Sequence, residues 1–461
     1  MARSRGFIYH LKSTLFLGSP LIGMNLTQSG IHLIDTLMLG WYGVPELAAS
    51  VLGSSFFFVL FIMGSGFAQA VTPLVATSFA ENDQIKIRRV TRMGIWLSVL
   101  YGVLTIPIMF FSGAILQLLG QEPILSNMAE SYLRFVCISI FPALTIMVLR
   151  SYLSALDRAQ IILGIGCLSL LLNSGLNWIL IFGNLGVPEM GLIGAAIASA
   201  ITQIITVLTF ILYITRHNYL RQYQILKRLY RIDWDIFGTV FNLGWPIGFT
   251  MLAEVGLFAG TAIIFGLIGT IPLAAHGIAL QVVSLSFMFH LGLSQATTVR
   301  VGYYIGKHDF DNLKEVVTIA LLLSLFVVLV TMVVFLVLPD SILGLFIAPD
   351  DAAKDAIIAV GVSLLFIASI FQIFDAGQVM MLGALRGFQD TKIPMLIAAF
   401  GYWLVGLPMC YSLGVYLNYG GVGVWVGLVL GLAIVCILLI VRLTFVYQKK
   451  LTSQLHNCKL S

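Results

Sequence analysis

The chain has 461 residues, of which 59% are hydrophobic and only 10% are charged, against roughly 25% charged residues in an average soluble domain. So few charges cannot cover the surface of a soluble protein of this length, which excludes a cytosolic enzyme, a nucleic-acid binder and a disordered scaffold. The chain must be solvated mostly by lipid. Its apolar residues suffice for about eleven to thirteen helical spans.

Twelve apolar runs of helical length follow one another along the chain, six before and six after a polar, basic stretch. They cover 14–41, 47–79, 90–112, 127–150, 160–183, 191–215, 236–268, 273–304, 315–338, 353–385, 392–415 and 421–447. We interpret the first run as a span and not as a removed signal peptide, because no small-residue cleavage pattern ends it early. This pattern predicts an all-α polytopic membrane protein with 12 transmembrane helices in two pseudo-symmetric six-helix lobes.

The basic residues test this count independently. Of the 25 Lys and Arg residues, 23 fall at a terminus or on every second connection, and only Arg134 and Lys354 fall on the opposite side. That opposite side instead carries acids, among them Asp350 and Asp351. By the positive-inside rule both termini are expected in the cytoplasm. The expected location is the plasma membrane, which in bacteria is the inner membrane.

An internal repeat relates the two halves. With one offset of 226 residues from Pro20/Pro246 to Asp83/Asp309, 15 of 64 positions are identical, including Gly66/Gly292. Six spans per repeat is an even number, so both copies enter the membrane in the same direction, as in transporters that alternate access between two lobes. The predicted division is an N-terminal lobe (1–215), a cytoplasmic linker (216–235), a C-terminal lobe (236–448) and a cytoplasmic tail (449–461).

Three acidic residues lie inside predicted spans: Asp35, Glu254 and Asp375. No Lys or Arg lies deep in any span, so the pattern offers these acids no fixed base. A carboxylate at the bilayer centre costs about 2.5–3.5 kcal/mol even on lenient insertion scales, so each acid either takes up a proton or holds a mobile cation. The pattern therefore indicates a cation-handling site. The structural alternative is a neutral, hydrogen-bonded tether between helices.

Several residues at helical spacing accompany the acids. Phe258 follows Glu254 by four residues and Phe371 precedes Asp375 by four, so aromatic faces lie beside both carboxylates. Such faces suit organic cations, although ordinary packing is an equal alternative. The polar residues Asn173, Asn177 and Ser199 lie in the fifth and sixth spans. They suit Asp35 or a hard cation such as Na⁺, or simple interhelical hydrogen bonds.

The sequence gives no sign of a cofactor or of an internal ATP site. It lacks the phosphate-binding pattern GxxxxGK[ST]. The five cysteines form no CxxC pair and four of them lie in apolar runs, which indicates buried thiols and neither a disulfide framework nor a metal cluster. An ion gradient is therefore the expected energy source, and we expect a monomer in contact with membrane lipid and with no nucleic acid.

Motifs distributed over most of the chain resemble those of the multidrug and toxic compound extrusion (MATE) family, specifically its NorM-type branch. The resemblance covers about residues 14–447. The motifs are Pro20-Leu21-Ile22, Asp35-Thr36 with Gly40, Gly194-Ala195-Ala196, the run 295–302 (QATTVRVG) and the run 382–391 (LGALRGFQDT).

This resemblance implies efflux of small cationic, amphipathic drugs and dyes in exchange for Na⁺ or H⁺. It implies an ion site at Glu254 and Asp375, which could hold Na⁺, and a second site at Asp35. It also implies supporting roles for Asn173, Asn177, Ser199 and Phe258. One departure stands out: a Na⁺-coupled member carries Tyr one turn before the tenth-span acid, where this chain has Phe371. The lost hydroxyl leaves the coupling ion open.

Two other functions compete with a cation-coupled multidrug antiporter. A flippase for lipid-linked precursors, from the same superfamily, needs Lys or Arg inside the spans to bind pyrophosphate, and the sequence shows none there. A receptor or scaffold has no use for three unpaired acids and a two-lobe repeat. The predicted mechanism is alternating access, in which ion and drug compete for the same negative charge.

Overall fold

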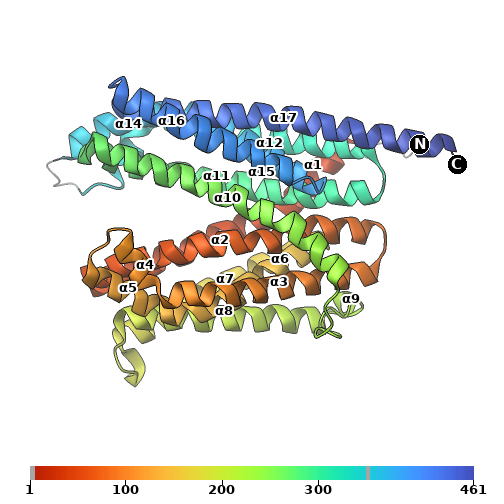
Figure 1. The fold of residues 1–461 in the computed structure, drawn as a ribbon, viewed down its shortest axis with the longest axis horizontal. Coiled ribbons are helices and arrows are strands. Elements are labelled where there is room, and N and C mark those ends of the chain that lie inside the picture. The colour runs from red at the N-terminus through yellow and green to blue at the C-terminus, as the bar shows by residue number, and fades with distance from the viewer. Residues whose placement is uncertain (1–5, 349–352, 461) are drawn as a thin grey trace. The chain divides into compact units, whose positions relative to one another are not determined.

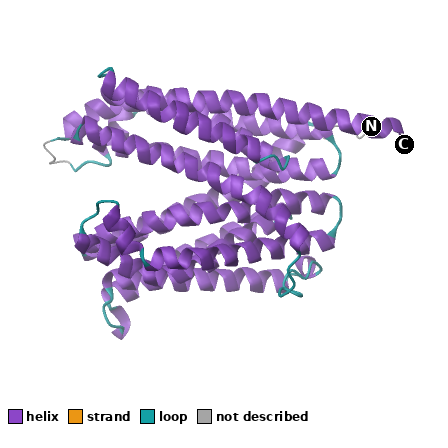
Figure 2. Cartoon of the chain, viewed as in Figure 1, coloured by secondary structure: helices purple, strands orange, loops and turns teal. Residues whose placement is uncertain are grey.

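The computed structural model describes residues 6–348 and 353–460, and every regular element in these ranges is a helix (Figures 1 and 2). Arg3, Arg5, Asp350 and Asp351, which contribute to the predicted charge asymmetry, lie outside the described residues. The side chains of residues 453–460 are not described, so the same holds for the side chains of Cys458 and Lys459.

The predicted twelve-helix architecture is confirmed within the described ranges. Eleven helical segments are long and apolar enough to cross a membrane. The twelfth is α1 (Phe7–Tyr42, 36 residues), whose hydropathy is lowered by polar residues such as Asn25, Gln28 and Asp35. In the first half the other spans are α2 (Val44–Ala80), α3 (Gln84–Phe110), α5 (Pro123–Val136) with η1 (Cys137–Ser139) and α6 (Ile140–Ala155), α7 (Ala159–Phe182) and α8 (Gly191–Arg216).

The second half has the same series of long helices. Its spans are α10 (Trp234–Ile268), α11 (Thr270–Gly306), α12 (Phe310–Val337), α14 (Lys354–Gly387), α15 (Lys392–Ala399) with η3 (Phe400–Gly406), α16 (Leu407–Tyr411) and η4 (Ser412–Tyr416), and α17 (Gly420–Leu460). Short helices lie in the connections: α4 (Ser112–Leu118), η2 (Asn184–Gly186), α9 (Asn218–Arg221) and α13 (Pro339–Gly344). Most spans begin and end within a few residues of the apolar runs that predict them.

The chain forms two compact units. Unit 1 comprises Met1–Ile22 and Phe249–Ser461, and unit 2 comprises Gly23–Gly248. Both boundaries fall inside a long helix, α1 or α10, shortly after the prolines Pro20 and Pro246. The division into an N-terminal lobe, linker, C-terminal lobe and tail remains a prediction.

The same glycine contact occurs once in each unit. In unit 2, α2 packs against α3 and α6, and a Cβ added at Gly66 would lie 2.3 Å from the backbone nitrogen of Gly248. In unit 1, α11 packs against α12 and α14, and a Cβ at Gly292 would lie 2.7 Å from the backbone nitrogen of Ile22. The offset of 226 residues relates Gly66 to Gly292, and it also relates Ile22 to Gly248. The repeat seen in the sequence is therefore also a repeat of backbone contacts.

The turns that precede α3 and α12 repeat in the same way. The side chain of Asp83 accepts a hydrogen bond from the backbone of Lys86 at 2.9 Å, and Asp309 accepts one from Asn312 at 3.2 Å. Each acid is an N-cap that satisfies a free backbone N–H group of its helix. The residues before them, Asn82 and His308, both adopt a left-handed conformation, with φ of 60° and 55°.

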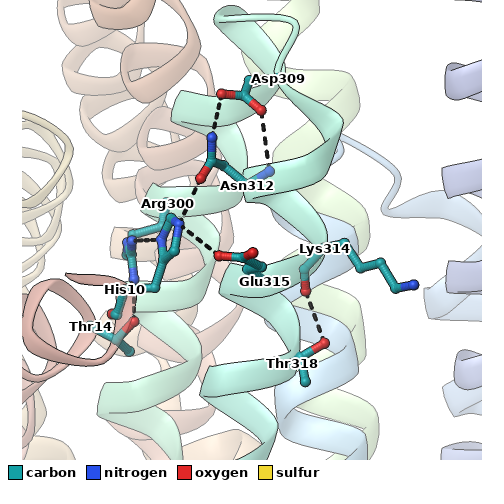
Figure 3. Close-up of polar contacts among 8 residues, drawn as sticks. All are labelled: His10, Thr14, Arg300, Asp309, Asn312, Lys314, Glu315 and Thr318. Carbon is teal, nitrogen blue, oxygen red and sulfur yellow. Dashed lines mark hydrogen bonds and ion pairs between the residues drawn. The ribbon is translucent and has the colours of Figure 1, made fainter. Parts of the chain in front are cut away.

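A buried polar network in unit 1 holds the beginning of α1 against α11 and α12 (Figure 3). The guanidinium of Arg300 donates to the backbone oxygen of His10 at 2.7 Å, to His10 Nδ1 at 2.6 Å and to the Thr14 hydroxyl. On its other side, His10 Nε2 lies 2.8 Å from Asn312 Oδ1 and 3.3 Å from Glu315 Oε2. Because a guanidinium has no acceptor, Nδ1 of His10 must accept. This network explains why the first residues belong to unit 1.

The structure corrects the assignment of 23 bases to connections or termini. Arg92, Arg150 and Arg300 lie within helices and are buried. Each donates to protein acceptors; for example, Arg92 donates to the backbone oxygens of Lys227 and Arg228. The helices are longer than the apolar runs, so a base that ends a run in the sequence still lies on a helix in the structure.

Candidate functional site

The first acidic site lies in unit 2, where α1, α7 and α8 meet. Asp35 is half-buried on α1, and its Oδ1 accepts a hydrogen bond from Asn177 Nδ2 at 2.5 Å. The same nitrogen also donates to Asn173 Oδ1 at 3.2 Å, and Asn173 Nδ2 reaches Ser199 Oγ at 3.5 Å. All four predicted residues of this site are thus brought together. The i,i+4 spacing of the two asparagines places both on one face of α7.

One oxygen of this site has no hydrogen-bond partner. Asn177 is fully buried, and its Oδ1 is a buried acceptor without a donor in the part of the chain that the structure describes. An unsatisfied buried acceptor costs free energy unless water or an ion supplies the missing interaction. A spare amide oxygen next to a carboxylate is therefore suited to receive a cation or a water molecule.

The second acidic site lies in unit 1, where α10, α14 and η3 meet. Glu254 is half-buried on α10, and Asp375 is buried on α14. A single amide connects them, because Gln378 Nε2 donates to Glu254 Oε1 at 3.1 Å and to Asp375 Oδ1 at 3.4 Å. The other end of the amide, Gln378 Oε1, accepts a hydrogen bond from the phenol of Tyr402. The structure therefore brings the two predicted acids together through two residues that were not predicted.

A π-helical segment positions Tyr402 for this contact. Within η3, the wider turn places Tyr402 against Gln378, while its neighbour Trp403 donates from Nε1 to the backbone oxygen of Ala253 at 3.1 Å. Ala253 directly precedes Glu254. Single π-helical turns are frequent at functional sites. In this structure, two consecutive aromatic residues contact both acid-bearing helices.

The prediction that the acids have no base beside them is wrong for Glu254. The positive charge of Arg386, the next-to-last residue of α14, interacts electrostatically with Glu254. The sequence pattern places Arg386 in a connection, but α14 extends to Gly387 and includes it. Two carboxylates and the charge of one guanidinium therefore act at the site in unit 1, which leaves a net negative charge of one when both acids are ionised.

The two predicted aromatic residues contact each other. The ring centroids of Phe258 and Phe371 are 6.3 Å apart, and Phe371 also lies 5.4 Å from Trp425. Phe371 is fully buried, whereas Phe258 is partly exposed. Of the two rings, Phe258 is therefore the one with exposed surface for a substrate, and Phe371 packs against it. A binding role for either ring stays a prediction.

Among the described residues, no group of three or more His, Cys, Asp and Glu side chains is arranged to hold a metal ion. The chemistry available at both sites is the binding of a monovalent cation or a proton by a carboxylate. The residues missed from the sequence were Gln378, Tyr402 and Arg386. Of these three, only Gln378 could have been found from the sequence, because it follows Asp375 by three residues and so shares its helix face.

Comparison with known proteins gives consistent matches over most of the chain. The family model described as MatE matches residues 20–179 and 246–412. The "Probable multidrug resistance protein NorM" of Rhizobium meliloti is 43% identical over 93% of this chain and 92% of its own. The protein of the same name from Agrobacterium fabrum is 40% identical over 97% of this chain and 96% of its own.

Solved structures show the same fold at low sequence identity. An outward-facing multidrug resistance MATE family transporter of the MOP superfamily matches with a TM-score of 0.87 and 19% identity, over 96% of this chain and 97% of that chain. The eukaryotic MATE transporter AtDTX14 matches with a TM-score of 0.84 and 20% identity, over 96% of this chain and 99% of that chain.

Proposed function

This chain belongs to the MATE family and is a multidrug efflux transporter, and we propose that it exports cationic amphipathic compounds in exchange for Na⁺ or H⁺. It is an integral membrane protein and a transporter, not an enzyme, and transporters of this family need no cofactor. Its relatives' names speak of multidrug resistance, which supports drugs and dyes as substrates.

The observation that carries the proposal is the pair of acids in unit 1. Glu254 and Asp375 lie within spans and share one amide donor, and the charge of Arg386 interacts with Glu254. Acidic side chains inside spans are costly and commonly mark ion pathways. Because the two ionised carboxylates outweigh the single positive charge, the site attracts a cation, and the coupling ion and a cationic drug compete for it.

Asp35 is the second proposed ion or substrate site, with Asn173, Asn177 and Ser199 as its polar partners. Phe258 is proposed to contact the drug through cation–π attraction, with Phe371 packed behind it. In the proposed cycle, an ion from outside neutralises the acids and releases drug outward, and drug from the cytoplasm then displaces the ion. Alternating access between the two lobes completes the exchange.

The charges also support an orientation and an environment. With 23 of 25 bases on one predicted side, we expect both termini in the cytoplasm and the protein in a bacterial inner membrane. We further expect a monomer that contacts lipid and binds no nucleic acid. These expectations can be checked by terminal fusions to reporter enzymes and by mass measurement in detergent.

The flippase alternative needs cationic side chains that face a substrate. The buried arginines of this chain instead donate to protein acceptors: Arg92 to backbone oxygens, Arg150 to Asn25 and Arg300 to His10 and Thr14. A pyrophosphate group would have to displace these bonds. The acids in the spans would also repel it.

Proteoliposomes test the proposed function directly. Purified protein is reconstituted, an inward Na⁺ gradient or an inward proton gradient is imposed separately, and the movement of the fluorescent cation ethidium is followed. We expect at least one gradient to drive ethidium against its own gradient. Ethidium movement driven by neither would reject the antiporter.

A further inference from the structure

The amide of Gln378 occupies the place between the two carboxylates of unit 1. Its nitrogen donates to Glu254 and Asp375, its oxygen accepts from Tyr402, and both Gln378 and Tyr402 have 0% exposed surface. We infer that Gln378, fixed by Tyr402, makes this carboxylate pair selective for protons over Na⁺. The inference rests on the proposed function, in which these carboxylates bind the coupling ion.

Tyr402 determines which end of the amide faces the acids. An ionised carboxylate can only accept hydrogen bonds, and an amide offers an accepting oxygen at one end and a donating NH₂ group at the other. Because the phenol donates to Gln378 Oε1, the NH₂ group is directed to Glu254 and Asp375. The opposite orientation would bring three acceptor groups together in a buried place, which is costly.

This orientation is unfavourable for Na⁺. A hard cation takes several oxygen ligands at once, but here N–H groups point at one oxygen of each carboxylate, and the amide oxygen is already bonded to Tyr402. The residue one turn before Asp375 supplies no oxygen either, because Phe371 is a hydrocarbon ring packed between Phe258 and Trp425. Sodium would therefore have to break the Gln378 hydrogen bonds and find few ligands in return.

A proton does not need several oxygen ligands. It binds one carboxylate oxygen, and the neutral acid needs no further ligands. The NH₂ group of Gln378 keeps its bond to the carboxylate that remains ionised. One proton thus removes one of the two negative charges of the pair without moving the amide, and the positive charge of Arg386, which interacts with Glu254, leaves the site without net charge.

Unit 2 provides the contrast within the same chain. There the NH₂ group of Asn177 also donates to the carboxylate of Asp35, but its amide oxygen has no donor among the described residues. The two sites therefore differ in the amide oxygen, which is bonded to Tyr402 in unit 1 and free to bind an ion in unit 2. The selectivity inferred here is confined to Glu254 and Asp375.

The test measures whether Na⁺ or protons displace ethidium from purified protein in detergent. Every protein compared carries Asp35→Asn, so that an ion at the unit 2 site cannot contribute, and the protein with this substitution alone is the reference. Ethidium binding is titrated in NaCl and in choline chloride at equal ionic strength, and then at several pH values. For the reference we expect equal affinities in the two salts and weaker binding as the pH falls. Tyr402→Phe frees the amide to turn its oxygen inward, and Gln378→Glu replaces the NH₂ group by oxygen. Both variants should become Na⁺-sensitive, with affinity lowered about tenfold in NaCl.

Two matched substitutions serve as controls. Gln372 is also buried on α14, but its oxygen accepts from Ser286 and Thr331, and Tyr411 is exposed on α16. Gln372→Leu and Tyr411→Phe should behave like the reference. Displacement of ethidium from the reference by Na⁺ would overturn the inference even if the variants do not fold, and so would folded variants whose ethidium binding does not change with Na⁺. Binding by the reference that responds to neither ion would instead reject the proposed function.

Discussion

In unit 2 a single carboxylate, Asp35, accepts from Asn177, whereas in unit 1 two carboxylates accept from the one amide of Gln378. Around these different sites the two units share their scaffold. The Gly66–Gly248 and Gly292–Ile22 contacts and the Asp83 and Asp309 caps are all related by one offset of 226 residues. The comparison shows that the close-packed glycine and the capping acid were kept in both copies, while the acids within the spans differ between them.

The units also differ outside the acidic sites. Unit 1 has Arg300 where the repeat-related position of unit 2 has the buried Leu74. Arg300→Leu therefore installs the unit 2 residue, and it leaves His10 and Thr14 without their donor. We expect a loss of about 3 kcal/mol in the free energy of unfolding in an SDS titration.

The control for this substitution is Lys314→Gln, because Lys314 is exposed and points away from the network (Figure 3). It should change stability by less than about 0.5 kcal/mol. Equal stability of Arg300→Leu and the wild type would show that the network does not hold α1.

The shared scaffold predicts matched losses in both units. Gly66→Val and Gly292→Val each force a side chain against a neighbouring backbone, so each should cost about 2 kcal/mol. Gly266 has open space around its Cβ position, and Gly266→Ala should not destabilise the protein. A large loss for one glycine and none for its partner would contradict the structural repeat.

The unit 2 site predicts a loss of substrate affinity. Asn177→Leu removes the donor to Asp35 and the link to Asn173. A hydrogen bond to a charged group contributes about 1.5 kcal/mol or more, so we expect the affinity for ethidium to fall about tenfold. On the same helix, Ser174 bonds to the backbone of Leu170, and Ser174→Ala should keep wild-type affinity. Unchanged binding by Asn177→Leu would remove Asp35 from the proposed site.

The smallest expected effect lies at the ion pair between Arg89 and Asp233, the residue directly before α10. The hydrogen bond that Arg89 donates to Asp233 lowers the pKa of Asp233 below its ordinary value. Since the folded state has the lower pKa, the stabilisation is present above about pH 4, the ordinary range of Asp, and is lost as the pH falls through the folded-state pKa. Asp233→Asn should therefore cost at most about 1 kcal/mol at neutral pH.

The difference between Asp233→Asn and the wild type should shrink on acidification in unfolding titrations. Asp340→Asn changes an exposed acid elsewhere and should follow the wild type at every pH. A difference that grows on acidification would show that Arg89 does not stabilise the ionised form of Asp233.

The sequence predicted the fold well because apolar runs and the alternation of bases are strong signals in a membrane protein. Helical spacing also predicted that Asn173 and Asn177 share a face, and the family resemblance suggested them and Ser199 as the partners of Asp35. The sequence did not predict Tyr402 or Arg386 at the second site. Tyr402 reaches Gln378 from a π-helical turn, and Arg386, whose charge interacts with Glu254, lies on a helix that extends past its apolar run. Neither property is visible as periodicity.

The most direct test of the proposed coupling site compares Asp375→Asn with the wild type in proteoliposomes under an imposed ion gradient. Asparagine keeps the size of the side chain and removes the charge. Asp355→Asn, an exposed acid at the start of the same helix, is the control. We predict gradient-driven ethidium transport by the wild type and the control, and none by Asp375→Asn at unchanged thermal stability. Wild-type transport rates in Asp375→Asn would contradict the assignment of the coupling site.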